Sequence, residues 1–248
     1  MGQPDIHFLE IAQRRIATRH RPGKAPTLVF LPGYASDMEG SKALALDDFA
    51  EAHGIGLLRL DYSGTGASDG EFADGTLDRW IDEALAAIDQ LTSGPLILVG
   101  SSMGGWIALH VALRRADRVV GLVGIAAAPD FTQWGYSESQ MQQIAREGLI
   151  ELDNPHGAEP SRTYRDFWQS GQALRLLEGL IAIDCPVRLI HGDEDSEVPL
   201  DIAQQLLRRL RSADVQLLII KGGGHRLSEP PEIDSIGRMI HGLLETLS

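Results

Sequence analysis

The chain has 248 residues, of which 43% are hydrophobic, and this is enough to bury a large core in one α/β domain. Its net charge of -13 argues against nucleic acid or an anionic membrane surface as a partner. A single cysteine excludes an internal disulfide, and because neither a membrane span nor a signal-peptide core is evident, we expect a soluble, unprocessed protein in the cytoplasm.

Predicted strands and helices alternate along most of the chain. Short strands at Ile6–Ile11 and Arg14–His20 are typical of a hairpin. Nearly continuous apolar runs, as in strands buried on both faces, follow at Thr27–Leu31, Ile55–Asp61, Pro95–Gly100, Val119–Ala126, Val187–His191 and Val215–Ile220. Helical patterns separate them at Lys42–His53, Thr76–Leu91, Trp106–Arg114, Leu200–Arg211 and Glu232–Leu247. This order predicts one α/β domain, residues 1–248, with a mostly parallel sheet of about eight strands flanked by helices.

Residues 130–184, after the sixth predicted strand, interrupt this alternation. They contain two helical stretches, Ser137–Ile150 and Arg162–Leu180, and no strand is expected between them. We interpret the segment as a small helical cap rich in aromatic side chains. These side chains either pin the cap to the sheet or line an apolar acyl pocket. The candidates for the pocket are Trp134, Tyr136, Phe167 and Trp168.

Small residues surround Ser102 at the end of the third apolar run. The sequence Gly-Ser-Ser-Met-Gly places this serine between a predicted strand and a predicted helix, with Gly100 and Gly104 on either side. Such a turn presents a serine at its tip and brings bare backbone segments close together. The alternative is a glycine-rich turn without chemistry. We predict a nucleophile elbow with Ser102 as the nucleophile.

A nucleophilic serine needs a base and an acid that orients the base. In this type of fold the acid follows the strand after the cap and the histidine follows the last strand. Asp195 and His225 occupy these positions, while Asp193 is a competing acid and His191 is expected to support the acid loop. The glycines before His225 lack the lysine and hydroxyl spacing of a phosphate-binding loop.

Cleavage of an acyl bond also needs donors for the oxyanion. The residue after the nucleophile, Met103, supplies one backbone N–H in this type of site. The second is expected from the loop after the first central strand, where Pro-Gly precedes Tyr34. A plain turn at Tyr34 is the alternative.

Four stretches together resemble the α/β-hydrolase family. The closer resemblance is to the branch of mitochondrial acyl-protein thioesterases and acyl-glucuronide esterases, although no Arg-rich presequence indicates a mitochondrial location here. It implies Ser102 as nucleophile, Asp195 as acid and His225 as base. The stretches that carry the resemblance are Leu31–Tyr34, Leu60–Gly70, Ile97–Trp106 and Arg188–Gly192.

The predicted function is therefore hydrolysis of esters or thioesters through an acyl-enzyme, with a small-molecule or acyl-chain substrate and no metal or cofactor. A peptidase or amidase and a carbon–carbon bond hydrolase are alternatives on the same fold. A ligand-binding module is the alternative outside enzymes. An acyl glucuronide would need a cation near the site, for which the cap offers Arg146, Arg162 and Arg165.

Overall fold

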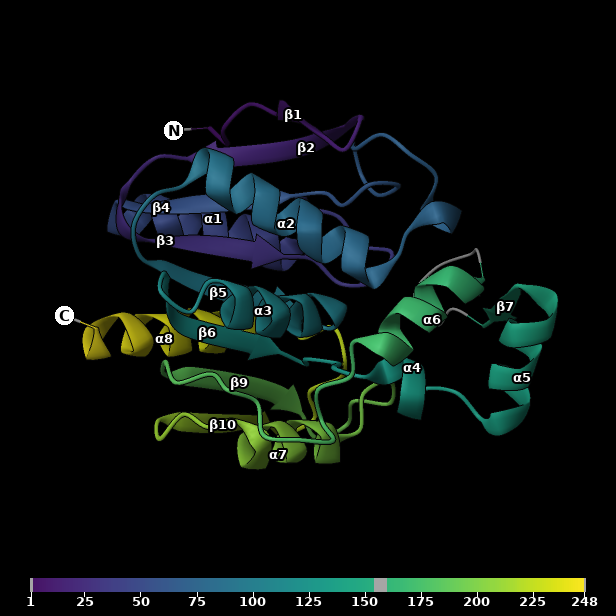
Figure 1. Ribbon diagram of the computed structural model, residues 1–248. Coiled ribbons are helices and arrows are strands. Elements are labelled where there is room, and N and C mark those ends of the chain that lie inside the picture. Colours follow the sequence, from purple (N-terminus) through teal and green to yellow (C-terminus); the bar gives the residue numbers. More distant parts are fainter. Residues whose placement is uncertain (1, 154–159, 248) are drawn as a thin grey trace.

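Eight strands form one twisted sheet in the order β1-β2-β4-β3-β5-β6-β9-β10 (Figure 1). The computed structural model describes residues 2–153 and 160–247. β1 and β2 pair antiparallel, β2 pairs antiparallel with β4, and the remaining neighbours are parallel. This confirms the predicted sheet. The strands are β1 (His7–Ile11), β2 (Arg14–Arg21), β3 (Lys24–Leu31), β4 (Ile55–Leu60), β5 (Leu96–Ser101), β6 (Val119–Ile125), β9 (Val187–Gly192) and β10 (Val215–Ile220).

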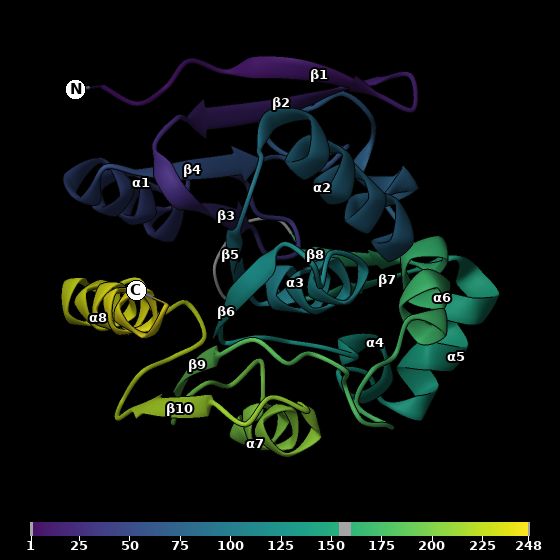
Figure 2. The same cartoon turned by 60° about the vertical axis from the view of Figure 1, so that its left-hand side comes forward.

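Helices cover both faces of the sheet (Figure 2). On one face lie α1 and α8, and on the other lie α2, α3 and α7. Within the described residues, no helix combines the length and the apolar character that crossing a membrane requires. The flanking helices are α1 (Ser41–His53), α2 (Leu77–Leu91), α3 (Met103–Arg114), α7 (Leu200–Arg209) and α8 (Pro230–Thr246), with a short 3-10 turn at Phe72–Asp74.

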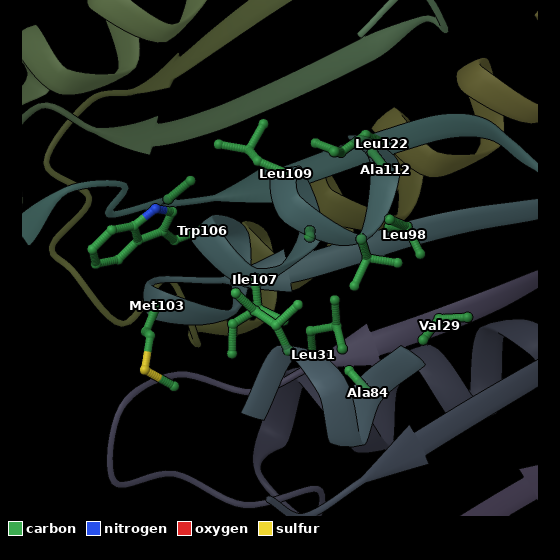
Figure 3. Packing of buried hydrophobic residues seen from close by; sticks show 14 of the residues in the cluster. Val29, Leu31, Ala84, Leu98, Met103, Trp106, Ile107, Leu109, Ala112 and Leu122 are labelled. Atoms are coloured by element: carbon green, nitrogen blue, oxygen red, sulfur yellow. The ribbon is translucent and has the colours of Figure 1, made fainter. Parts of the chain in front are cut away.

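The continuous apolar runs have a simple physical reason. Side chains alternate between the two faces of a strand, and both faces are covered here. In β5, Leu96 and Leu98 join the core beneath α2, α3 and α7, whereas Ile97 and Val99 join the core beneath α1 and α8. Figure 3 shows Leu98 facing the buried side of α3. Burial on both faces therefore accounts for strands without polar alternation.

The cap segment, residues 130–184, departs from the prediction because it contains two strands. β7 (Leu149–Leu152) and β8 (Ser161–Tyr164) form an antiparallel pair. Gly148 ends α5 with φ +89, and the next residues continue as a strand with Ile150 buried. The two expected helices are therefore shorter, as α5 (Glu138–Glu147) and α6 (Arg165–Ala173), and a further short helix, α4 (Phe131–Trp134), precedes them. Residues 154–159 of the predicted cap lie outside the described residues.

The two ends of the cap segment are tied to each other and to α3. The buried carboxylate of Asp130 accepts hydrogen bonds from the backbone N–H groups of Leu176 and Leu177. The carbonyl of Leu174 accepts from Trp106 Nε1 at 3.2 Å and from His110 Nε2 at 2.9 Å. Burial lowers the pKa of His110 to about 4, so its imidazole is neutral at pH 7. These contacts seat the cap at the carboxyl edge of the sheet, next to α3 (Figure 1).

We predict that Gly104→Ala destabilises the fold while Gly242→Ala does not. A Cβ on Gly104 would lie 1.9 Å from the carbonyl oxygen of Leu31, whereas a Cβ on Gly242 meets no atom within 4 Å. The first substitution should lower the free energy of unfolding by about 2–3 kcal/mol. The second should raise it by about 0.5–1 kcal/mol through helix propensity. Urea unfolding of the two variants checks this, and equal effects would contradict it.

Candidate active site

The three residues predicted as nucleophile, acid and base lie at one edge of the sheet. Ser102 stands between β5 and α3, Asp195 follows β9, and His225 follows β10. These strands are parallel, so their carboxyl ends share the edge outside which α/β sheets bind ligands. The topology thus gathers residues that are far apart in the sequence.

The turn at Ser102 is strained and tightly packed. Ser102 has φ 53 and ψ -120, a conformation that non-glycine residues seldom adopt. Its backbone N–H donates to the carbonyl of Ile125 at 2.9 Å, which fixes the turn against β6. A Cβ on Gly100 would lie 2.3 Å from the carbonyl oxygen of Gly104. The small residues predicted for an elbow are therefore required sterically, and the hydroxyl is held at the tip.

His225 connects the serine to the aspartate. Its Nε2 lies 3.1 Å from Ser102 Oγ, and its Nδ1 lies 2.9 Å from Asp195 Oδ2. The ionised carboxylate only accepts hydrogen bonds, so Nδ1 carries the proton and Nε2 of the neutral ring accepts from the serine hydroxyl. The side chain of Asp195 is 0% exposed and that of His225 is 14% exposed. The His225 side chain is therefore slightly exposed to solvent, whereas the Asp195 carboxylate is fully buried.

The backbone and two histidines surround the Asp195 carboxylate. Oδ1 accepts from the N–H groups of Glu197 and Val198 at 2.9 and 2.8 Å. Burial alone would raise the pKa of Asp195, but the hydrogen bond from His225, the positive charge of this ring when it is protonated, and the two backbone donors bring this pKa below its usual value. His191 is buried beside it, with Nε2 donating to the Val198 carbonyl at 2.8 Å and lying 3.4 Å from Oδ2. His191 thus lies where support of the acid loop was expected.

Asp193, the competing acid, makes a different contact. Its Oδ1 accepts from the backbone N–H of Gly222 at 2.5 Å, in the loop that leads to His225. Lys42 Nζ donates to the Arg226 carbonyl on the other side of His225, and burial lowers the pKa of Lys42 to about 8. The sequence gives no signal for this lysine, because 184 positions separate the two residues. Both side chains hold the histidine loop, and Asp195 is the carboxylate in contact with the imidazole.

The loop after β3 lies against the serine turn. A Cβ on Gly33 would come within 3.4 Å of both Ser101 O and Ser102 Cβ. Tyr34 follows directly, and Met103 begins α3 on the other side of the serine. The segments that contain the two predicted oxyanion donors therefore adjoin Ser102. The Tyr34 hydroxyl donates to the carbonyl of Arg162 at 2.9 Å, which links this loop to the cap segment.

The cap aromatics divide into two groups. Phe167 is 1% exposed and packs on the Tyr34 ring, with 4.7 Å between ring centroids. The other three use their polar atoms within the cap segment or at its base: Trp134 Nε1 donates to Pro129 O, Trp168 Nε1 donates to Thr132 O, and Tyr136 Oη lies 2.6 Å from Thr163 Oγ1. Of the four candidates, Phe167 is thus the one that contacts the Tyr34 ring.

Further rings around Tyr34 were not among the sequence candidates. Phe72, Trp80 and Phe131 lie with centroids 5.0, 6.0 and 5.8 Å from the Tyr34 ring. Phe72 and Trp80 belong to the segment after β4, so a search confined to the cap misses them. Their aromatic character is the available signal, and it does not distinguish a pocket from an ordinary core.

Cations of the cap are engaged with their own segment. Arg146 and Arg162 pair with Glu147 and Glu151 at 2.6 and 2.7 Å, and Arg165 donates to the carbonyl of Ala145 at 3.2 Å. Among residues 2–153 and 160–247, no group of three or more His, Cys, Asp or Glu side chains is arranged to hold a metal ion.

Comparison with known proteins identifies relatives over nearly the whole chain. A model of the Alpha/beta hydrolase family matches residues 28–233. Human mitochondrial palmitoyl-protein thioesterase ABHD10 is 35% identical over 252 residues, covering 100% of this chain and 80% of that protein. The mouse protein of the same name is 38% identical over 237 residues, covering 94% and 80%. The names of these relatives include a mitochondrial location, so the prediction of a cytoplasmic location is contradicted.

Solved structures are similar over the same length. A putative hydrolase from Agrobacterium vitis S4 has 39% identity and a TM-score of 0.91, with 96% of this chain and 98% of that chain covered. Alpha/beta hydrolase domain-containing protein 10 from mouse has 35% identity and a TM-score of 0.93, with 98% and 100% covered. These similarities include the cap segment as well as the sheet.

The lowered pKa of Asp195 predicts an acid-dependent loss of stability. A carboxyl group whose pKa is lower in the folded chain than in the unfolded chain stabilises the fold above its unfolded pKa. This contribution disappears as the pH falls through the folded value. The stability advantage of the wild type over Asp195→Asn should therefore be complete near pH 5 and should narrow toward pH 3. Urea unfolding across this range measures it, and a constant difference would contradict the assignment.

Proposed function

The chain belongs to the alpha/beta hydrolase family, and from this premise we propose that it is a serine hydrolase acting on carboxylic esters or thioesters. The observation that carries the proposal is the hydrogen-bonded row from Ser102 Oγ through the His225 ring to the Asp195 carboxylate. An ordinary serine hydroxyl is a weak nucleophile at neutral pH, and this row supplies the base that activates it.

Each residue then has one role in acyl transfer. His225 Nε2 takes the Ser102 proton while Oγ attacks the carbonyl carbon, and Asp195 fixes the tautomer and offsets the imidazolium charge. The backbone N–H groups of Met103 and Tyr34 donate to the oxyanion. The alcohol or thiol leaves with the proton from His225. Water, deprotonated by the same histidine, then releases the carboxylic acid from the acyl-enzyme.

An apolar acyl chain is the substrate group that suits the surroundings. Rings of Tyr34, Phe131 and Phe167 gather next to the loop that abuts Ser102, and aromatic side chains of this kind line sites for apolar ligands. In this proposal Trp134, Tyr136 and Trp168 hold the shape of the cap around these rings. The two relatives named palmitoyl-protein thioesterase support a long acyl group and a thioester bond.

Ser102→Ala is expected to abolish hydrolysis without loss of the fold. The test compares wild type and variant on p-nitrophenyl esters with acyl chains of two to sixteen carbons and on matching acyl thioesters. We expect kcat/KM to rise with chain length in the wild type and to fall by about 10⁴-fold or more in the variant. Thermal unfolding verifies that both proteins are folded. Hydrolysis that persists in Ser102→Ala would contradict the mechanism.

Asp195→Asn and Asp193→Asn form a matched pair on one loop. Of these two aspartates, Asp195 is the one that contacts the imidazole, so its amide variant should favour the wrong tautomer of His225 and lower kcat by about 10³- to 10⁴-fold. Asp193→Asn retains an oxygen that accepts from Gly222, and its kcat should stay within about threefold of the wild type. Steady-state kinetics on one ester measures kcat for both variants. A larger loss of kcat in Asp193→Asn than in Asp195→Asn would assign the role of the acid to Asp193.

A further inference from the structure

Two buried charged side chains hold one residue of the loop that contains Tyr34. Asp61 Oδ1 accepts from the Met38 N–H at 2.7 Å, and Arg59 Nη1 donates to the Met38 carbonyl at 2.9 Å. Arg59 lies on β4 and Asp61 follows its end, while Met38 belongs to the loop after β3. We call this arrangement of Arg59, Asp61 and Met38 the Met38 clamp. It fixes both polar atoms of a single residue from the neighbouring strand.

The Asp61 side of the clamp has little freedom to move. Asp61 is 1% exposed, and its second oxygen accepts from the Ala67 N–H at 2.8 Å. Its own N–H donates to the Ala17 carbonyl at 3.0 Å. A Cβ on Gly66 would lie 2.1 Å from Oδ2, so the turn after β4 closes directly over the carboxylate. The acceptor for Met38 is therefore held from several sides.

Stability alone is a poor explanation for these charges. Arg59 is 0% exposed, and burying a charge of either sign costs several kcal/mol before any attraction is counted. The carboxylates of Glu39 and Asp47 lie 3.9 Å away, and Arg59 Nε is buried with no hydrogen-bond partner among the described residues. An apolar pair of similar volume would avoid this cost. What the two charged side chains supply is strong, directional hydrogen bonds to the backbone N–H and carbonyl of Met38.

This hold acts on the loop that faces the serine. Met38 is four positions after Tyr34, and a Cβ on Gly33 would lie 3.4 Å from Ser102 Cβ. The start of the loop has a weaker tie, because the buried Tyr62 hydroxyl lies 3.5 Å from the Pro32 carbonyl. The Tyr34 N–H therefore lies between two points fixed by the segment around β4. A shift of Met38 would displace this donor relative to the oxyanion.

We propose that Asp61 and Arg59 are positioning residues for the hydrolysis, because the Met38 clamp sets where the Tyr34 N–H meets the oxyanion. This inference rests on the proposed function. It adds two residues that act through the loop and do not touch the substrate.

Asp61→Asn tests the clamp, with Glu83→Gln as its matched control. Both residues are buried carboxylates that accept backbone N–H groups of the segment after β4, and burial raises the pKa of each. Of these two residues, Asp61 is the one that also accepts from Met38. Each of its two oxygens accepts a backbone N–H, so the amide variant must turn an NH2 group toward the N–H of Met38 or of Ala67. The measurements are kcat and KM on one ester, thermal unfolding, and the affinity for an aryl trifluoromethyl ketone. Ser102 Oγ adds to the ketone carbon, the proton moves to His225, and the resulting alkoxide occupies the oxyanion position.

We expect Asp61→Asn to weaken binding of the transition state and to leave binding of the substrate unchanged. Loss of one oxyanion donor costs about 10²- to 10³-fold in kcat, so displacement of one should cost about 10- to 100-fold. KM should stay within about twofold, and affinity for the ketone should fall by the same factor as kcat/KM. Glu83→Gln should keep kcat and ketone affinity within about threefold of the wild type even where its unfolding temperature falls.

Several outcomes would overturn the inference. Unchanged kcat in folded Asp61→Asn would do so, as would equal losses in Glu83→Gln or a loss expressed in KM. Where Asp61→Asn does not fold, Arg59→Met decides by the same measurements, since it removes the donor to the Met38 carbonyl. A wild type that neither hydrolyses esters or thioesters nor binds the ketone through Ser102 would refute the proposed function itself, and the inference with it.

Discussion

Where β5 meets α3, backbone segments pack so closely that Gly100 and Gly104 cannot carry side chains, and the site depends on this constraint. A side chain at Gly104 would collide with the end of β3, and one at Gly100 would collide with the first turn of α3. With both positions empty, the chain turns within a few residues and leaves Ser102 in a strained conformation at the tip. The same approach brings the loop after β3 alongside the serine. One packing requirement thus places both the hydroxyl and the backbone of the loop after β3.

Around this turn, the site is built from side chains that fix loops. Asp195 holds His225 directly, Asp193 and Lys42 hold the two sides of the histidine loop, and Asp61 holds the loop after β3. Each of these contacts ends on a backbone group or on the imidazole. A parallel sheet gathers its loops at one edge but leaves their detailed positions open. Buried polar contacts then reduce that freedom, at a cost in desolvation.

Much of the fold was predictable from the sequence because its signals are local. Strands buried on both faces have uninterrupted apolar runs, and the small residues around Ser102 indicate a tight turn. The sheet, the family and the hydrolase class predicted from these signals are confirmed. The pair β7 and β8 was missed because four-residue strands carry too little periodicity. Lys42 and the Met38 clamp were missed because their contacts join distant positions. The predicted cytoplasmic location was wrong. It was inferred from the absence of targeting signals, and the names of the relatives, which include a mitochondrial location, contradict it.

The central claim is that the geometry at residue 102, and not a neighbouring serine, makes the nucleophile. Ser101 is the adjacent residue, lies on β5 and is 8% exposed, so Ser101→Ala is a close control. Intact protein would be treated with a fluorophosphonate and the modified peptide sequenced by mass spectrometry. The account predicts one adduct on Ser102, retained in Ser101→Ala and lost in Ser102→Ala. An adduct on another residue, or none on the folded wild type, would contradict it.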